Sequence, residues 1–124
     1  MADKLSANER DIMECYWEYG SLMSEDISKL LPDKKWKITT LLTFLSRLVS
    51  KGMLRVERKG KANIYHPIVS KSEYVKYESK QFIDRMFAGS TKNFIAALIE
   101  GNDLSKEDFT ELRNWLSSQE TTDD

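Results

Sequence analysis

Nine lysine and arginine residues fall between Lys34 and Lys61, and only one acidic residue, Glu57, interrupts them. The whole chain of 124 residues has a formal net charge of −1, so this segment is a local concentration of positive charge. Dense positive charge without neighbouring carboxylates is typical of surfaces that bind the phosphates of nucleic acids. The segment therefore predicts an interface with a polyanion.

Four polar side chains within this segment have the chemistry to read base edges. The polar side of one predicted helix carries no acidic residue and presents Thr39, Thr40, Thr43 and Arg47. Hydroxyl and guanidinium groups form hydrogen bonds with base edges in the major groove of DNA. We take these four as the candidates for base contact. The candidates for phosphate contact are the nearby cations Lys37, Lys51, Arg55, Arg58, Lys59 and Lys61.

Each of these assignments has a plainer structural alternative. The basic segment could be an ordinary solvated surface, and Arg47 could pair with an acidic residue inside the fold. Trp36 could pack against the preceding helix, or it could donate its indole N–H to the DNA backbone. Tyr65 could belong to the core of a hairpin or touch the sugar–phosphate edge, and the sequence allows both.

Residues for catalysis or metal binding are sparse. Cys15 is the only cysteine and His66 the only histidine, so the chain has no thiolate or imidazole cluster and no intramolecular disulfide. It also lacks a glycine-rich phosphate loop and a His-Glu metal motif. We expect no enzymatic activity, no cofactor and no bound metal, with Cys15 acting as a small buried hydrophobic residue.

The chain shows no pattern for export or membrane insertion. Residues 1–4 lack the apolar run of a signal peptide, and no stretch approaches 18 apolar residues. A single cysteine fits a reducing compartment. We therefore expect a cytoplasmic protein.

Two helices are predicted ahead of the basic segment. The run Ser6–Glu9 reads as a capping box that opens the first helix, which Gly20 ends. Ser24 is placed to cap a second helix, and Pro32 stops it. These two helices would support the element that carries the candidate base readers.

The basic segment itself predicts a helix followed by a hairpin. The helix spans about Ile38 to Lys51, with Gly52 as the left-handed residue after it. Its expected inward arc consists of Ile38, Leu41, Leu42, Phe44, Leu45, Leu48 and Val49. Strands are expected over residues 53–57 and 62–66, joined by a turn over residues 58–61 in which Gly60 supplies the positive φ. The strand residues expected to face the core are Leu54, Val56 and Ile64.

Residues 71–124 predict three further helices with a different character. They begin at the capping box of residues 70–73, at Thr91 and at Ser105. Residues 1–70 carry 12 basic and 9 acidic side chains, a net of +3, whereas residues 71–124 carry 7 and 11, a net of −4. A 54-residue helical segment rarely builds a sufficient core alone. We expect it to form a dimer through Phe82, Met86, Phe87, Phe94, Leu98, Phe109, Leu112, Trp115 and Leu116.

This order of elements predicts a mostly α-helical protein with a winged helix-turn-helix. Residues 1–70 would form the DNA-binding domain with a small β wing, and residues 71–124 the helical dimerisation domain. The helix at about 38–51 would lie in the major groove, and the wing at 53–66 would lie on the backbone. Such a homodimer would bind a palindromic operator and repress transcription. The alternative function is a winged-helix module that docks an acidic protein.

The chain resembles the BlaI/MecI family of penicillinase-type repressors, with CopY-type copper repressors as relatives. The resemblance extends over nearly the whole chain and rests on an ordered set of segments: Trp36, Thr40, Thr43, residues 47–49, Lys51, Gly52, residues 65–69, Glu73, Tyr74, residues 78–82, residues 88–90 and residues 104–108. It implies a dimeric winged-helix repressor that acts at inverted repeats built around TACA/TGTA.

Three departures from the family pattern concern specificity and induction. Thr39 stands where the family often has a polar or basic residue, and Leu42 where it often has a polar one, so these are the two positions at which base preference could differ from that of the family. The Asn-Phe bond cut in β-lactam-responsive members aligns with Ala97–Leu98, so we expect no induction by that proteolysis. The paired Cys-x-Cys motifs of copper-responsive members are missing. The inducing signal therefore does not follow from the resemblance.

Overall fold

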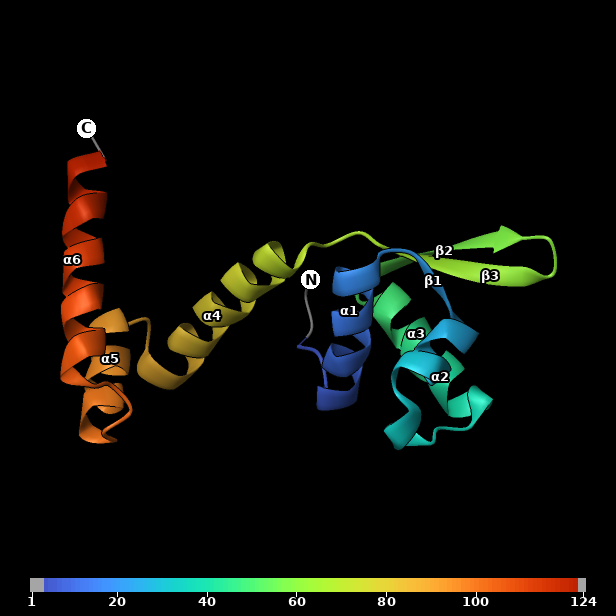
Figure 1. The fold of residues 1–124 in the computed structure, drawn as a ribbon, viewed down its shortest axis with the longest axis horizontal. Coiled ribbons are helices and arrows are strands. Elements are labelled where there is room, and N and C mark those ends of the chain that lie inside the picture. The colour runs from blue at the N-terminus through green and yellow to red at the C-terminus, as the bar shows by residue number, and fades with distance from the viewer. Residues whose placement is uncertain (1–3, 123–124) are drawn as a thin grey trace. The chain divides into compact units, whose positions relative to one another are not determined.

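The computed structural model of the chain describes residues 4–122. The prediction that residues 1–4 lack a signal peptide therefore lies mostly outside the described residues. The elements, shown in Figure 1, are α1 (Ala7–Tyr19), β1 (Leu22–Met23), α2 (Ser24–Leu30), η1 (Pro32–Lys34), α3 (Ile38–Ser50), β2 (Leu54–Lys59), β3 (Ala62–Pro67), α4 (Lys71–Phe87), α5 (Thr91–Glu100) and α6 (Lys106–Thr122). One compact unit ends at Ser79, and a second begins at Lys80. No helix within the described residues is both long and apolar enough to cross a bilayer.

The start and end of α1 confirm the predicted signals. The backbone N–H of Glu9 donates to Ser6 Oγ at 3.2 Å, and the N–H of Ser6 donates to Glu9 Oε1 at 2.7 Å. These reciprocal bonds satisfy donors that the first helical turn would otherwise leave free. Gly20, at φ 85°, ends the helix with an N–H that donates to Tyr16 O at 2.9 Å.

The predicted cap of α2 is wrong by one residue. Ser24 is the first helical residue, and Met23 occupies the cap position in an extended conformation. Met23 is held extended because it pairs with Ile64 of β3, so the chain passes directly from strand to helix. The carboxylate of Asp26 then accepts the N–H of Met23 at 2.8 Å.

The helix α3 has the predicted position but a narrower buried stripe than its sequence suggests. Leu41, Leu45 and Leu48 are buried, and Gly52 follows at φ 78° as expected. The prediction that Ile38 and Leu42 face inward is wrong, since these side chains are 53% and 41% exposed. Ile38 is the first residue of α3, and Leu42 lies at the border between the apolar arc and the polar face.

The three strands form an antiparallel sheet in the order β1-β3-β2. Leu22 and Val56 both pair with Tyr65, one on each side of β3. The turn is tighter than predicted, because Arg58 and Lys59 belong to β2 and only two residues separate the strands, the first being Gly60 at φ 63°. Figure 1 shows the hairpin extending past the helices that carry the core.

That extension explains why the burial predicted for one hairpin residue is wrong. Leu54 is buried and Ile64 half-buried, but Val56 is 43% exposed although it was expected to face the core. The core lies under the base of the hairpin only, so alternation along the strand does not translate into burial farther out. The wing is therefore a solvated projection with a small apolar base.

The core of the first unit is built from fourteen buried hydrophobic residues, which run from Leu5 to Tyr74 in the sequence. Tyr74 lies in the first turn of α4, and its ring centroid is 5.6 Å from that of Trp17. The indole N–H of Trp17 donates to Val69 O at 2.9 Å. The beginning of α4 thus packs with the first unit, which continues to Ser79 rather than stopping at the expected boundary near residue 70.

The second unit has no comparable interior. The three predicted helices are present, and the hydroxyl of Ser90 caps α5 by accepting the N–H of Asn93 at 3.1 Å. Phe82, Phe87 and Phe94 pack together with ring centroids 5.6–5.9 Å apart. Even so, no residue between Lys80 and Glu120 reaches full burial. The unit gathers its aromatic rings without enclosing them.

Candidate nucleic-acid interface

The solvent-facing side of α3 presents all four predicted base readers. Thr39, Thr40, Thr43 and Arg47 are exposed, and the first turn of α3 contains no acidic residue. The hydroxyl of Thr43 donates to Thr39 O at 3.0 Å within the helix. Because that proton is already committed, Thr43 Oγ1 is free to act as an acceptor, as a base amino group requires.

The guanidinium of Arg47 is the strongest donor on this face. Its Cζ atom lies 6.0 Å from the centroid of the Phe44 ring, which supports the side chain from below. Among the residues that the structure describes, no ion pair engages Arg47. The alternative prediction, that Arg47 pairs with an acidic residue inside the fold, is therefore not supported by the structure.

The approach to α3 is fixed by aromatic packing. Trp36 packs on Phe44 with ring centroids 5.1 Å apart, so its aromatic contact is with α3 and not with the preceding helix, which was the expected partner. Lys34 bonds to Asp11 at 2.8 Å, and its charge is used within the fold. Lys37, in the cap position of α3, is exposed.

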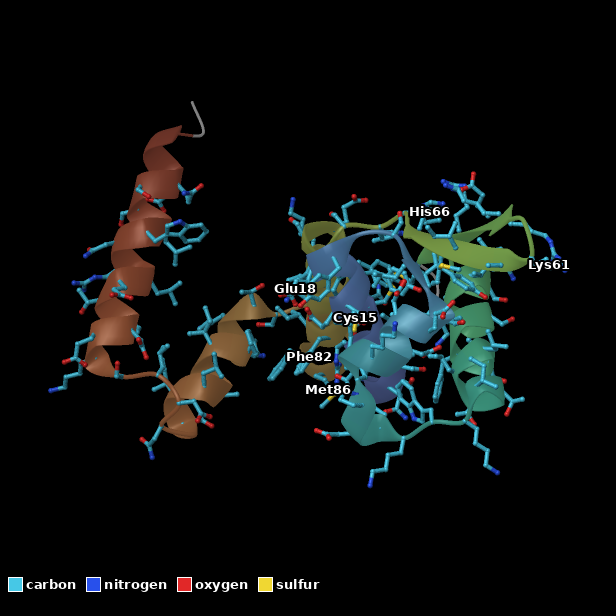
Figure 2. All side chains as sticks on the ribbon, turned by 45° about the vertical axis from the view of Figure 1, so that its right-hand side comes forward. Cys15, Glu18, Lys61, His66, Phe82 and Met86 are labelled. Atoms are coloured by element: carbon cyan, nitrogen blue, oxygen red, sulfur yellow. The ribbon has the colours of Figure 1, made fainter. Side chains whose placement is uncertain are left out.

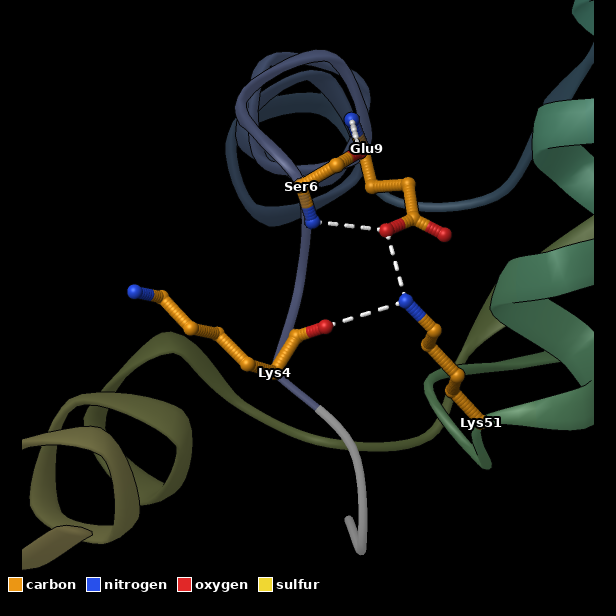
Figure 3. A network of polar contacts seen from close by, with 4 residues as sticks. All are labelled: Lys4, Ser6, Glu9 and Lys51. Atoms are coloured by element: carbon orange, nitrogen blue, oxygen red, sulfur yellow. Dashed lines mark hydrogen bonds and ion pairs between the residues drawn. The ribbon is translucent and has the colours of Figure 1, made fainter.

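Lys51 is the one phosphate candidate whose charge is taken up inside the molecule (Figure 3). Its Nζ lies 2.7 Å from Glu9 Oε1 and 3.0 Å from Lys4 O. Glu9 is only 1% exposed. Burial opposes ionisation of this carboxyl, but hydrogen bonds from Lys51 and Ser6 outweigh it, and the pKa of Glu9 lies below its ordinary value.

This pair changes the role assigned to Lys51. An ammonium group bonded to a buried carboxylate is a poor phosphate ligand, because leaving that carboxylate unpaired carries a large penalty. The pair instead joins the end of α3 to the beginning of α1. Lys51 therefore helps to fix the orientation of the helix that carries the base readers.

The wing supplies the remaining exposed cations. Arg55, Arg58, Lys59 and Lys61 are all exposed, and Figure 2 shows Lys61 at the outer end of the hairpin. The side chain of Arg58 is oriented by its Nε–H, which donates to Gly60 O at 3.1 Å. Several exposed cations on one projecting ribbon suit contacts with successive phosphates.

The single acid of the basic segment is paired with the only histidine of the chain. Glu57 Oε1 lies 3.1 Å from His66 Nε2, and His66 Nδ1 lies 2.6 Å from Ser21 Oγ. The hydrogen bond from His66 is the main reason that the pKa of Glu57 lies below its ordinary value. Among the described residues, no group of three or more potential metal ligands forms around this histidine or elsewhere.

Two other predicted residues have core positions. Tyr65 is buried, which favours its role in the core of the hairpin over contact with a sugar–phosphate edge. Cys15 is buried as expected, and burial, together with the carboxylates of Glu18 and Asp11, raises the pKa of its thiol. A protonated, enclosed thiol has little nucleophilic character.

The predicted dimer residues fall into two groups by exposure. The rings and side chains that are half-buried within the second unit are Phe82, Phe87, Phe94, Leu98 and Leu112. The large apolar side chains that are exposed are Met86, Phe109, Trp115 and Leu116. Trp115 alone is 58% exposed. These four exposed side chains are the ones that a partner surface would have to cover.

Sequence reasoning missed the contribution of Glu9 and the exposure of two apolar residues on α3. Glu9 was recognised as a cap, but its bond to Lys51 joins residues 42 positions apart and leaves no local signal. Ile38 and Leu42 carried the periodicity of core residues. Only the packing of α3 on its neighbours shows that they face solvent.

Comparison with known proteins gives one consistent family. Residues 5–118 match the family described as Penicillinase repressor. The penicillinase repressor of Bacillus licheniformis is 28% identical over 114 residues, which are 91% of this chain and 89% of that protein. The methicillin resistance regulatory protein MecI of Staphylococcus aureus (strain N315) is 29% identical over 119 residues, covering 94% and 95% of the two chains.

A solved structure matches the first unit. The solution structure of the DNA-binding domain of the repressor BlaI superposes with a TM-score of 0.51 and 29% identity, covering 57% of this chain and 88% of that one. The predicted winged-helix fold is thereby confirmed for the part of the chain that carries the candidate interface.

Proposed function

The chain belongs to the penicillinase repressor (BlaI/MecI) family of DNA-binding transcriptional repressors, and we propose that it acts as a homodimer on a palindromic operator. The observation that carries the proposal is the exposed side of α3, which presents hydroxyl and guanidinium groups and not one acidic side chain. A solvated helix without a binding partner has no reason to exclude carboxylates. A polyanionic partner supplies that reason.

In the proposed complex α3 enters the major groove. The groove is about 12 Å wide and accepts one helix, with residues near the helix N-terminus meeting the base edges. Thr39, Thr40 and Thr43 occupy the first two turns, and Arg47 follows one turn later. Arg47 is the residue we expect to make the most base-specific contact, because a guanidinium can bond to O6 and N7 of guanine together.

The proposed phosphate contacts come from the exposed cations on either side of α3. They are Lys37 before the helix and Arg55, Arg58, Lys59 and Lys61 on the wing. Lys51 is left out of this set because its ammonium is bonded to Glu9. With four or five phosphates neutralised per protomer, a dimer would show a slope of log K against log salt of roughly −7 to −9.

The proposed dimer forms through the second unit. Residues 80–120 contain no buried residue but expose Met86, Phe109, Trp115 and Leu116. A second copy would cover these side chains and give the aromatic cluster the interior it lacks. A twofold dimer presents its two α3 helices to half-sites related by the same symmetry, about 34–36 Å or a multiple apart.

Two finer features of the family are carried over with different outcomes. We propose inverted half-sites of the TACA/TGTA kind, on the strength of family membership. Release by cleavage at an Asn-Phe bond is not proposed, because the corresponding pair here is Ala97–Leu98. Either of these two statements can be wrong while the proposal of a homodimer on a palindromic operator remains correct.

A mobility-shift titration tests the proposal against its rival, the docking of an acidic protein. The full chain is titrated into a duplex with inverted TACA/TGTA half-sites and into a duplex of the same composition with one half-site scrambled. Tight binding to the inverted repeat and much weaker binding to the scrambled duplex are expected. Binding to neither duplex at 50 mM salt would contradict the proposal and favour the rival.

A further inference from the structure

Two large apolar side chains of α3 are exposed although they belong to its apolar arc. Ile38 is 53% and Leu42 is 41% exposed. Residues four apart in a helix are neighbours on its surface, so these two form a continuous apolar strip. Leu42 borders Thr39, three residues before it, at the edge of the face that the proposed function places against DNA, and Ile38 extends the strip to the first residue of the helix.

The internal packing of the first unit does not account for this strip. The side of α3 that enters the core is formed by Leu41, Leu45 and Leu48, with Phe44 and Val49 packed against it. Ile38 is also a mediocre helix former, so it is not explained by helix propensity in the first turn. The exposure of two large aliphatic side chains beside the polar face indicates contact with something outside the unit.

The charge around the strip selects the chemistry of that contact. Lys37 precedes it, Arg47 lies farther along the same helix, and α3 has no acidic residue. The covering surface must therefore be negatively charged and must also present apolar groups. The major groove of DNA meets both conditions, because the C5-methyl group of thymine is exposed there between two rows of phosphates.

We propose that Ile38 and Leu42 determine specificity by packing on thymine methyl groups in the major groove. The proposal rests on the proposed function, since it requires α3 to enter that groove. Four residues of helix rise about 6 Å, which is about two base-pair steps. The strip therefore covers one or two thymines in each half-site.

The test uses the full chain and duplexes whose thymines have lost their methyl groups. Preferred sites are first selected from a library of random duplexes, and each thymine of the selected half-site is then replaced by deoxyuridine. At one or two positions, binding should weaken about three- to fivefold for each methyl group removed. Uridine outside the half-sites should change nothing.

Variants of α3 then identify the residue that senses each methyl group. Leu42→Ala and Ile38→Ala remove the strip while keeping an exposed, helix-favouring residue. With either variant, at least one of the sensitive positions should no longer distinguish thymine from uridine. Ser50→Ala, at an exposed position of α3 with no assigned DNA contact, is the control, and its sensitivity to uridine should equal that of the unaltered chain. Thr43→Ser, which deletes a methyl group, tests whether the threonine reads the thymine methyl instead.

Three outcomes would overturn the inference. The unaltered chain could bind its selected duplex with a steep salt dependence and ignore every uridine substitution. Leu42→Ala and Ile38→Ala could both keep full sensitivity while Thr43→Ser loses it, which would assign methyl recognition to the threonine. In both cases the proposed function would stand. Failure to select any duplex would overturn the proposed function together with the inference.

Discussion

The two units of this chain differ in how they bury their apolar side chains. The first encloses fourteen hydrophobic residues and keeps polar and cationic groups on its surface. The second, from Lys80 onward, has no buried residue up to Glu120 and exposes several of its largest apolar side chains. The first unit therefore has the interior of a self-sufficient domain, whereas the second leaves its apolar side chains without full cover.

The same contrast appears in the distribution of charge. The segment from Lys34 to Lys61 is rich in cations and has one acid, which His66 holds in a hydrogen bond. Residues 71–124 have a net charge of −4. A unit with that charge would be repelled by phosphates. Charge and burial therefore support the proposal that DNA binding and self-association belong to different parts of the chain.

The largest expected effect comes from breaking the ion pair that braces the first unit. Lys51→Met leaves the buried carboxylate of Glu9 without its partner, and removing one member of such a pair costs about 3–5 kcal/mol. Chemical denaturation should show a large loss in the free energy of unfolding of the first unit. The double variant with Glu9→Gln should recover part of it, and equal stability of Lys51→Met and the unaltered chain would contradict the bracing role.

The same pair predicts an acid dependence of stability. The folded pKa of Glu9 lies below its ordinary value of 4.5, so the pair contributes fully above that value. The contribution is lost as the pH falls through the folded pKa and the carboxylate becomes protonated. Denaturation at pH 3 and pH 7 should therefore show a smaller difference for Glu9→Gln than for the unaltered chain. An identical difference would show that Glu9 does not titrate in this way.

In the second unit, substitution of an exposed residue should dissociate the proposed dimer. The same substitution on the surface of a self-sufficient domain would have little effect. Trp115→Glu places a charge in the proposed dimer contact, where loss of a central aromatic residue typically costs 2 kcal/mol or more. Sedimentation should show dissociation into folded monomers, with a rise in the dimer dissociation constant of about 30-fold or greater. Asn114→Ala, a polar neighbour on α6, is the control and should remain dimeric. A dimeric Trp115→Glu variant would remove this contact from the interface.

A substitution on the exposed face of α3 should weaken DNA binding but leave dimerisation unchanged. Arg47→Ala is expected to weaken operator binding by about 1–3 kcal/mol, or roughly 5- to 150-fold, and to relax base preference at one position. Because Arg47 is exposed and forms no ion pair among the described residues, stability and dimerisation should be unchanged. A monomeric or unfolded variant would show that Arg47 has a structural role instead.

The smallest expected effect belongs to the wing. Lys59→Ala removes one exposed cation, which should weaken binding to all duplexes alike and make the slope of log K against log salt shallower by about 1 per protomer. Lys51→Gln would serve as a poor comparison because of its internal pair, so Lys29→Ala on α2 is the matched surface control. An effect of Lys59→Ala on base preference would contradict a purely phosphate-directed wing.

The sequence predicted the features that depend on local chemistry. Capping boxes at Ser6 and Ser70 mark the starts of α1 and α4, and Gly52 and Gly60 take the positive φ angles expected of them. Each of these signals lies within a few residues of its effect. The order of elements followed from them, and with it the winged-helix fold.

The wrong predictions concern tertiary contacts, that is, which other parts of the fold pack against a helix or strand. Ile38, Leu42 and Val56 have the periodicity of core residues but are exposed, because helical and strand patterns do not reveal where the core ends. Lys51 was grouped with the phosphate ligands because its partner, Glu9, is 42 positions away. Sequence therefore identified the candidate site as a region, while tertiary contacts decided which of its side chains are free to bind.

The central claim is that two copies of the first unit bind DNA together because the second unit joins them. Its most direct test compares the salt dependence of binding to a duplex with two inverted half-sites and to a duplex with one. The account predicts a slope of roughly −7 to −9 for the inverted repeat and a value about half as steep when only one protomer can engage. Equal slopes for the two duplexes would contradict it.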